Sequence, residues 1–235
     1  RSIMAGQKKI LSGDEAVAWG AKAAGVALGV GYPGTPSTEI LETLSKIGGS
    51  AQWAPNEKVA LEVATGVGVG NARALVTMKH VGLNVAADPL FTLTYMGTTG
   101  GMVIVSADDP GLASSQNEQD NRNYAKFAQM PMLEPTDSQD AYDLTIRAFE
   151  LSERFKTPVL LRMTTRVCHS MSPVELRERE EPVRAGSYWH DMRTRVMLPA
   201  NAARAHVRLV ETMKSLQEYN ETSDLWEEHG TGSFG

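Results

Sequence analysis

Short apolar segments alternate with segments of helical periodicity through the first 170 residues, and this alternation restricts the possible folds more than any other feature. The apolar segments are continuous runs that end at glycine, proline or polar turns, which is typical of strands buried on both faces of a parallel sheet. Six such strands are predicted, at residues 27–32, 51–54, 73–78, 101–107, 131–134 and 158–163.

The segments between these strands predict helices. Residues 36–47 repeat apolar side chains three and four positions apart, and Thr35 or Ser37 can cap their first turn. Further helices are expected at 57–69, 83–95, 124–130 and 137–155. Strands that alternate with helices of this length form βαβ units, so the expected fold class is α/β: a three-layer α/β/α domain around a mostly parallel sheet of about six strands.

The charge and the cysteine content exclude several classes of protein. The 235 residues include 23 Lys and Arg against 28 Asp and Glu, a net charge of −5, and no basic stripe suits a nucleic acid. The one cysteine, Cys168, excludes a disulfide framework, and also a cysteine-based zinc site or an iron–sulfur cluster held by this chain alone. Because we find no apolar run of about 18 residues and no secretory signal, we expect no membrane span and a cytoplasmic protein.

The composition changes near residue 175. Of the 21 glycines, all but four lie in the first 170 residues, whereas charged side chains are denser beyond that point. We therefore expect a folded domain over residues 1–175 and a charged, helical extension over residues 176–235 that leads toward a further domain absent from this chain.

Ligands bind open α/β sheets at the carboxyl ends of the strands, so the loops at those ends are candidate sites. The stiff loop 31–38 opens a helix and offers hydroxyl groups to an anion. Glu57 opens the helix after the second strand, and Glu62 is its rival for the role of a ligand-facing carboxyl. His80 follows the third strand, and the long polar loop 108–122 ends at Arg122, which is suited to hold a carboxylate.

Each of these residues also has an ordinary structural explanation. A carboxyl such as Glu57 is favourable at any helix start, His80 is explained by one satisfied hydrogen bond in a loop, and Arg122 by a surface ion pair. The glycines of residues 66–70 end a helix instead of following a strand, which favours close packing over dinucleotide binding. The residues alone leave these alternatives open.

Five long segments, taken in order, resemble one known family. They are GYPGTPSTEI (31–40), PNEKVALEVATGVGVGNARALVTMKHVGLN (55–84), SSQNEQDNRNYAKFA (114–128), MLEPTDSQDAYD (132–143) and PVLLRMTTRVCHS (158–170). Together they resemble the N-terminal region of the 2-oxoacid:ferredoxin oxidoreductases, and among these most closely the alpha subunit of the indolepyruvate ferredoxin oxidoreductases. The resemblance covers about residues 8–175 continuously and the remainder more loosely.

The resemblance implies the pyrimidine-binding domain of a thiamine diphosphate enzyme, in which a glutamate hydrogen-bonds the aminopyrimidine ring and promotes loss of the thiazolium proton. The interval of 25 residues to Gly82 selects Glu57 for this role, since Glu62 would need a gap. Thr35 and Arg122 would contact the substrate carboxylate. The implied cofactor site comprises Glu57, Pro33, Gly34, Thr35, His80, Gly82 and Asn84.

The implied activity is the oxidative decarboxylation of an aryl 2-oxoacid of the indolepyruvate type to acyl-CoA, with ferredoxin as electron acceptor and coenzyme A as acyl acceptor. Pyruvate, a branched-chain 2-oxoacid and 2-oxoglutarate are the alternative substrates. A non-catalytic interaction or dimerisation domain is the alternative from another class of function. Ala113 stands where members of the family often carry a histidine.

The chain has no Gly-Asp-Gly motif of the kind that holds magnesium and the cofactor diphosphate, and no metal site is predicted within it. The resemblance therefore implies a diphosphate-binding domain and an iron–sulfur domain elsewhere, a second (beta or gamma) subunit, and a homo-oligomeric assembly. We expect the chain to be one part of a longer or divided enzyme and to be catalytically incomplete by itself.

Overall fold

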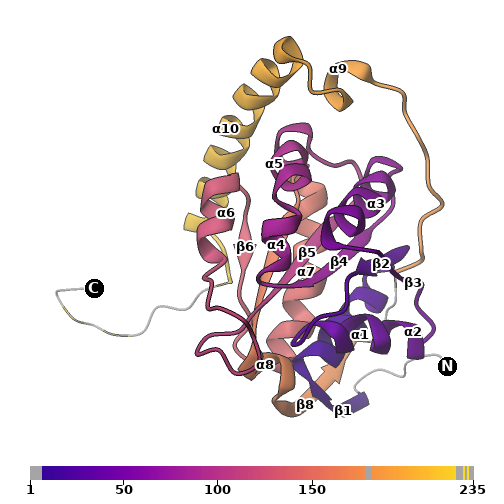
Figure 1. Cartoon of the computed structure of the whole chain (residues 1–235), viewed down its shortest axis with the longest axis vertical. Coiled ribbons are helices and arrows are strands. Elements are labelled where there is room, and N and C mark those ends of the chain that lie inside the picture. Colours follow the sequence, from indigo (N-terminus) through magenta and orange to yellow (C-terminus); the bar gives the residue numbers. More distant parts are fainter. Residues whose placement is uncertain (1–6, 178–180, 226–229, 231, 233–235) are drawn as a thin grey trace.

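The central sheet confirms the sequence prediction in its strand number and in the approximate position of each strand (Figure 1). The structure, a computed structural model, describes residues 7–177, 181–225, 230 and 232. Within this part of the chain the sheet has six strands, and all neighbours pair in parallel. From edge to edge they are β3 (Ala51–Trp53), β2 (Leu28–Gly31), β4 (Ala74–Lys79), β5 (Met102–Asp108), β7 (Val159–Thr164) and β6 (Met132–Leu133).

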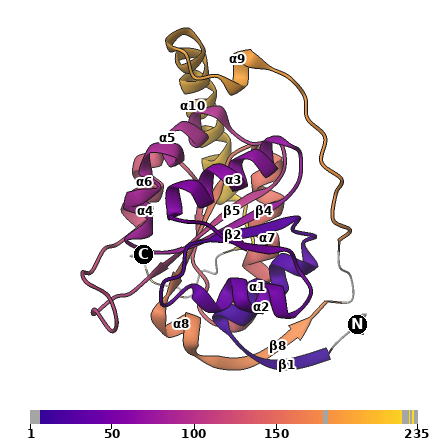
Figure 2. The same cartoon turned by 45° about the vertical axis from the view of Figure 1, so that its right-hand side comes forward.

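Helices cover both faces of this sheet and give the predicted three-layer arrangement (Figure 2). One layer is α1 (Gly13–Ala23), α2 (Thr38–Lys46) and α7 (Ser138–Phe155), and the other is α3 (Glu57–Val69), α4 (Gly82–Val85), α5 (Ala87–Met96) and α6 (Arg122–Ala128). Successive strand residues point to opposite faces, so Val103 belongs to the first core and Ile104 to the second. Burial of both faces explains why the strands are continuous apolar runs.

Three elements near the two ends of the domain were not predicted. The strand β1 (Gln7–Ser12) pairs antiparallel with β8 (Met171–Leu176), in a second sheet apart from the first. Ser12 then caps α1, because its hydroxyl accepts from the backbone N–H of Glu15 while the Glu15 carboxyl accepts from the N–H of Ser12. A short helix, α8 (Thr165–His169), links β7 to β8.

The prediction of one helix over residues 83–95 was wrong in one respect. The segment forms two helices, α4 and α5, with a break at Ala86. Pro89 has no N–H to donate to the carbonyl of Val85 four residues earlier, so a continuous hydrogen-bond ladder is not possible at this point.

The C-terminal extension is largely helical, as expected. Its helices are α9 (Met192–Arg195) and α10 (Pro199–Glu221), and α10 packs against α5. Residues 181–191 have no regular structure and run along the outside of the domain to reach α9 (Figure 1). Among the described residues, no helix combines the length and the hydropathy that crossing a membrane requires.

Candidate functional site

The order of the strands places the candidate site between β2 and β4. The chain runs from β2 to its neighbour β3 at the sheet edge and then returns to β4 on the opposite side of β2. Open α/β sheets bind ligands at the carboxyl ends of strands where the order reverses in this way. The loops that follow β2 and β4 are those that carry Thr35 and His80.

The loop after β2 is held by its own hydrogen bonds. The Gly34 N–H donates to the Thr38 hydroxyl over 2.9 Å, and the Ser37 hydroxyl donates to the Gly34 carbonyl over 2.9 Å. Ser37 occupies the N-cap position of α2 as expected, but its side chain makes no capping bond. Pro33 and Thr35 are exposed, so the Thr35 hydroxyl is accessible to a ligand.

Lys79 connects this loop with the ends of the two next strands. A Cβ built on Gly34 would lie 3.2 Å from Lys79 Cδ, so the lysine stem lies directly against the loop backbone. The Lys79 ammonium donates to Gln116 Oε1 over 3.2 Å. The loops after β2, β4 and β5 therefore meet around one side chain.

Glu57 is the buried carboxyl of the site. It is the first residue of α3, where the Asn56 side chain accepts from the Val59 N–H and caps the helix. Glu57 is only 6% exposed, and its carboxyl has no hydrogen-bond or ion-pair partner among the described residues. Glu62, its rival, is exposed. The structure thus singles out Glu57 as a largely buried carboxyl without a hydrogen-bond or ion-pair partner in this part of the chain.

Gly82 has no side chain, and this lets the Glu57 carboxyl lie directly against its backbone. A Cβ built on Gly82 would lie 2.7 Å from Glu57 Cγ and 2.8 Å from Glu57 Oε1, which no side chain can accept without displacing the glutamate. The start of α3 and the start of α4 therefore approach each other with the carboxyl between them. The 25-residue interval noticed in the sequence corresponds to a direct contact.

His80 is fully buried and has an unused ring nitrogen. Its Nε2 lies 3.0 Å from the Asn117 carbonyl oxygen and 3.2 Å from Asn117 Oδ1. A carbonyl oxygen only accepts, so Nε2 carries the proton of the neutral ring and Nδ1 is an acceptor. Nδ1 is buried and has no partner in the described residues, which leaves it able to accept one hydrogen bond.

The long loop after β5 lies over these residues and contributes amide side chains that the sequence did not single out. Asn117 contacts the His80 ring, as described above. Gln119 Oε1 accepts from Asn84 Nδ2 over 2.9 Å, and Gln119 Nε2 donates to the His80 carbonyl over 3.1 Å. Asn84 also accepts from the Tyr124 hydroxyl over 2.8 Å. The only signal in the sequence was the richness of this loop in Gln and Asn.

A buried network anchors the far end of the same loop. Arg162 on β7, 5% exposed, donates through Nε to Asp108 Oδ2 and through Nη1 to Glu134 Oε1, each over 2.8 Å. Asp108, 1% exposed, also accepts from the Asn121 N–H over 2.9 Å and from the Ser106 hydroxyl over 2.9 Å. The buried Asp108 carboxyl therefore accepts from three donors: the Arg162 guanidinium, the Asn121 N–H and the Ser106 hydroxyl.

Asp109 anchors the first residues of the loop that follows β5. Its carboxyl accepts from the Ser114 N–H over 2.8 Å and from the Thr165 hydroxyl over 2.7 Å. Burial by itself would raise the pKa of Asp109, but these bonds, with one from the Ala113 N–H, lower it to about 2. The loop between Asp109 and Asn121 is thus fixed at both ends.

Arg122 does not join the cluster around Glu57 through any contact in the described residues. It is exposed, and its Nε and Nη2 donate to the Asp120 carboxyl over 2.7 to 3.1 Å. These hydrogen bonds from Arg122 are the main reason why the pKa of Asp120 is lowered to about 2. Arg122 would have to share or release Asp120 before it could hold a substrate carboxylate.

Asp14 is a second buried carboxyl at this edge of the sheet. It follows Gly13, whose Cα lies so close to α8 that an added Cβ would be 2.2 Å from the Val167 carbonyl oxygen. Asp14 is fully buried, and neither carboxyl oxygen has a hydrogen bond of ordinary geometry in the described residues. Burial raises the pKa of Asp14 well above its usual value, and the Cys168 thiol and the Glu39 carboxyl act on it as weaker influences.

Asp14→Asn should make the domain more stable at high pH. The unfolded chain ionises Asp14 above its usual pKa of 3.8 while the folded chain keeps it protonated, so stability falls as the pH rises from 4 toward the raised pKa. Removing this loss should add about 1–3 kcal/mol at pH 8 and nothing at pH 4. Thermal unfolding should show it as a Tm gain of about 2–4 °C per kcal/mol. The exposed Asp88→Asn is the control, and an equal Tm gain at both pH values would contradict a protonated Asp14.

This chain matches the sequence pattern of one protein family and is similar to several curated proteins. The pattern of the family described as pyruvate flavodoxin/ferredoxin oxidoreductase, thiamine diP-binding, matches residues 19–229. Indolepyruvate oxidoreductase subunit IorA of Archaeoglobus fulgidus is 44% identical over 240 aligned residues, covering 98% of this chain and 38% of the relative. The subunit of the same name from Methanothermobacter marburgensis is 47% identical over 225 residues, which cover 94% of this chain and 36% of that relative.

A solved structure has the same fold. The 2-oxoglutarate:ferredoxin oxidoreductase from Magnetococcus marinus, solved with 2-oxoglutarate, coenzyme A and succinyl-CoA bound, superposes with a TM-score of 0.72 at 16% identity. The match covers 96% of this chain and 47% of that one. The chain spans little more than a third of the length of the curated relatives, so most of each relative lies outside the matched region.

Proposed function

The chain belongs to the pyruvate flavodoxin/ferredoxin oxidoreductase family, and from this premise we propose that it is the pyrimidine-binding domain of a 2-oxoacid:ferredoxin oxidoreductase that uses thiamine diphosphate. The observation that carries the proposal is the buried Glu57 carboxyl, which lies against Gly82 without a protein partner among the described residues. A ligand nitrogen that donates to this carboxyl would supply the missing partner.

The residues around Glu57 fit the cofactor's pyrimidine ring. When bound, thiamine diphosphate supplies a nucleophilic carbon and an electron sink for decarboxylation. The proposed role of Glu57 is to hold a proton at a ring nitrogen, which a carboxyl screened from water does more strongly than one in solvent. His80 Nδ1 is a further acceptor at the same edge, and the absence of a side chain at Gly34 and Gly82 lets Lys79 and Glu57 lie against the backbone there.

For the substrate we propose an aryl 2-oxoacid of the indolepyruvate type. The identities of 44% and 47% to subunits named for indolepyruvate support this choice over pyruvate, branched-chain 2-oxoacids and 2-oxoglutarate. The proposed contacts to the substrate carboxylate are the exposed hydroxyl of Thr35 and the guanidinium of Arg122, which would exchange Asp120 for the substrate.

The rest of the proposed enzyme lies outside this chain. The curated relatives are more than twice as long, which leaves room for a domain that binds magnesium and the cofactor diphosphate and for one that holds iron–sulfur clusters. We also propose a second subunit and a homo-oligomeric assembly, with ferredoxin as the electron acceptor and coenzyme A as the acyl acceptor. The product would be acyl-CoA, with the electrons passed to ferredoxin.

The proposal is tested with the complete enzyme that contains this chain. Dye reduction without oxygen, measured with indolepyruvate, pyruvate, 2-oxoisovalerate and 2-oxoglutarate, should give the highest kcat/KM for indolepyruvate. A different preferred oxoacid would overturn the proposal of an aryl substrate but would leave the proposed reaction type unchanged. No reduction with any of them, together with no heat of thiamine diphosphate binding in the presence of magnesium, would favour a non-catalytic interaction domain.

A further inference from the structure

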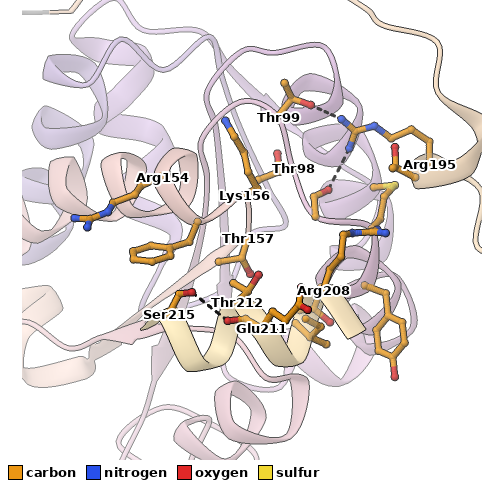
Figure 3. A pocket seen from close by; sticks show the side chains of 17 residues that line it. Thr98, Thr99, Arg154, Lys156, Thr157, Arg195, Arg208, Glu211, Thr212 and Ser215 are labelled. Atoms are coloured by element: carbon orange, nitrogen blue, oxygen red, sulfur yellow. Dashed lines mark hydrogen bonds between the residues drawn. The ribbon is translucent and has the colours of Figure 1, made fainter. Parts of the chain in front are cut away.

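A large pocket lies at the opposite end of the sheet from Glu57. It has a volume of about 570 Å³ and opens between α10 and the turns that precede β5 and β7 (Figure 3). These turns are at the amino ends of the strands, so the pocket is separate from the site proposed above. The domain contributes residues 94–99 and 154–157 to its wall, and the extension contributes residues of α9 and α10.

The charge of this pocket differs from that of the chain. Four cationic side chains line it, Arg154, Lys156, Arg195 and Arg208, against the single carboxyl of Glu211. The chain as a whole has a net charge of −5. A cationic wall on an acidic protein raises the local concentration of anions.

Two of the cations have no partner in the described residues. The side chains of Lys156 and Arg208 make no hydrogen bond or ion pair there, and they come from opposite walls, one at the end of α7 and one on α10. Arg154 is occupied, since its guanidinium lies over the rings of Phe155 and Tyr219. The two free cations are therefore the ones able to take a ligand charge.

The remaining cation holds the pocket together and adds one unused donor. Arg195 of α9 donates to the Gly97 carbonyl and to the Thr99 hydroxyl, which ties the extension to the domain. Its Nε is buried and has no partner in the described residues. The hydroxyl of Thr212, on α10, also lines the pocket and has no hydrogen bond there.

We propose that this pocket binds a small molecule that carries a phosphate chain, with Lys156 and Arg208 as its charge partners. Ammonium, guanidinium and hydroxyl groups are the donors that phosphate oxygens accept from most strongly. The volume is within the range of about 300–1,000 Å³ seen for ligand sites, and two cations without a partner in the described residues come from opposite walls, so the expected ligand carries at least two phosphates. This proposal does not depend on the function proposed for Glu57.

Isothermal titration of the full chain with inorganic pyrophosphate and with ADP tests the proposal. Both should bind with a saturable heat, and Lys156→Met and Arg208→Met should each weaken binding at least tenfold. Equal affinity for the two probes would mean that the phosphates alone are recognised, and tighter binding of ADP would mean that the nucleoside adds contacts. Arg204→Met, one turn before Arg208 on the same helix and outside the pocket, should leave both affinities unchanged.

Two further variants make the result specific to this pocket. Thr212→Val removes a hydroxyl without removing charge and should weaken binding several-fold with an unchanged circular dichroism spectrum. Glu57→Ala should leave pyrophosphate binding unchanged, so failure here and failure of the proposed function are distinguishable. No saturable binding, or affinities that do not respond to Lys156→Met and Arg208→Met, would overturn the proposal.

Discussion

Glu57→Ala should lower the turnover of the complete enzyme by about 100- to 10,000-fold while the domain stays folded, because the variant removes the buried carboxyl that we propose holds a proton on the cofactor. The measurement is oxoacid-dependent dye reduction without oxygen, with circular dichroism of the same sample. A glutamate with a merely structural role would show the reverse: a lower Tm and nearly normal turnover. Near-normal turnover therefore contradicts the assignment.

Two matched variants separate the carboxyl itself from its helix. Glu62→Ala, five residues later on the exposed side of α3, should leave turnover unchanged. Gly82→Ala keeps Glu57 but brings a methyl carbon to 2.7 Å from its Cγ, so it should lower turnover by displacing the carboxyl. If Glu62→Ala were the damaging change, the assignment of the two glutamates would have to be exchanged.

Arg162→Met should destabilise the domain by about 3–5 kcal/mol, because it leaves the Asp108 carboxyl buried and without its charge partner. Chemical denaturation of the chain measures this directly. In thermal unfolding the same loss corresponds to about 2–4 °C for each kcal/mol. The loop after Asp109 should also become more sensitive to proteolysis, since Asn121 bonds to the same carboxyl.

Arg177→Met is the control for this prediction. Arg177 pairs with Asp143 over 2.8 Å, but the two side chains are 58% and 36% exposed, so its loss should cost less than about 1 kcal/mol. Adding Asp108→Asn to Arg162→Met should recover part of the stability, because it removes the uncompensated charge. A loss below 1 kcal/mol for Arg162→Met would mean that the network does not hold the loop.

The parallel sheet could be predicted from the sequence because its signal is local. Most of the strands are short, continuous apolar runs between turns, and this length and these flanking turns are typical of strands buried on both faces. The pair β1 and β8 could not be predicted in this way, since more than 150 residues separate the partners and each strand alone is short and partly exposed. Pairing of the two ends of a domain is a tertiary feature without a local pattern.

The sequence could separate the two candidate glutamates, but it could not show the contacts that surround the candidate site. The interval to Gly82 selected Glu57, and burial distinguishes it from the exposed Glu62. The partnership of Asp108 with Arg162 spans 54 residues and has no sequence signal. The engagement of Arg122 by Asp120 is local, but an aspartate two residues away does not by itself reveal a hydrogen bond.

The two anchors of the loop between Asp109 and Asn121 have a consequence for the entropy of ligand binding. Ordering a free backbone costs roughly 1–2 kcal/mol for each residue, so a loop of this length that closed only around its ligand would take most of the binding free energy to become ordered. Here the carboxyl groups of Asp109 and Asp108 fix both ends while the domain folds. The amides that this loop carries are already in place over His80 when a ligand arrives, and affinity is not lost to assembling them.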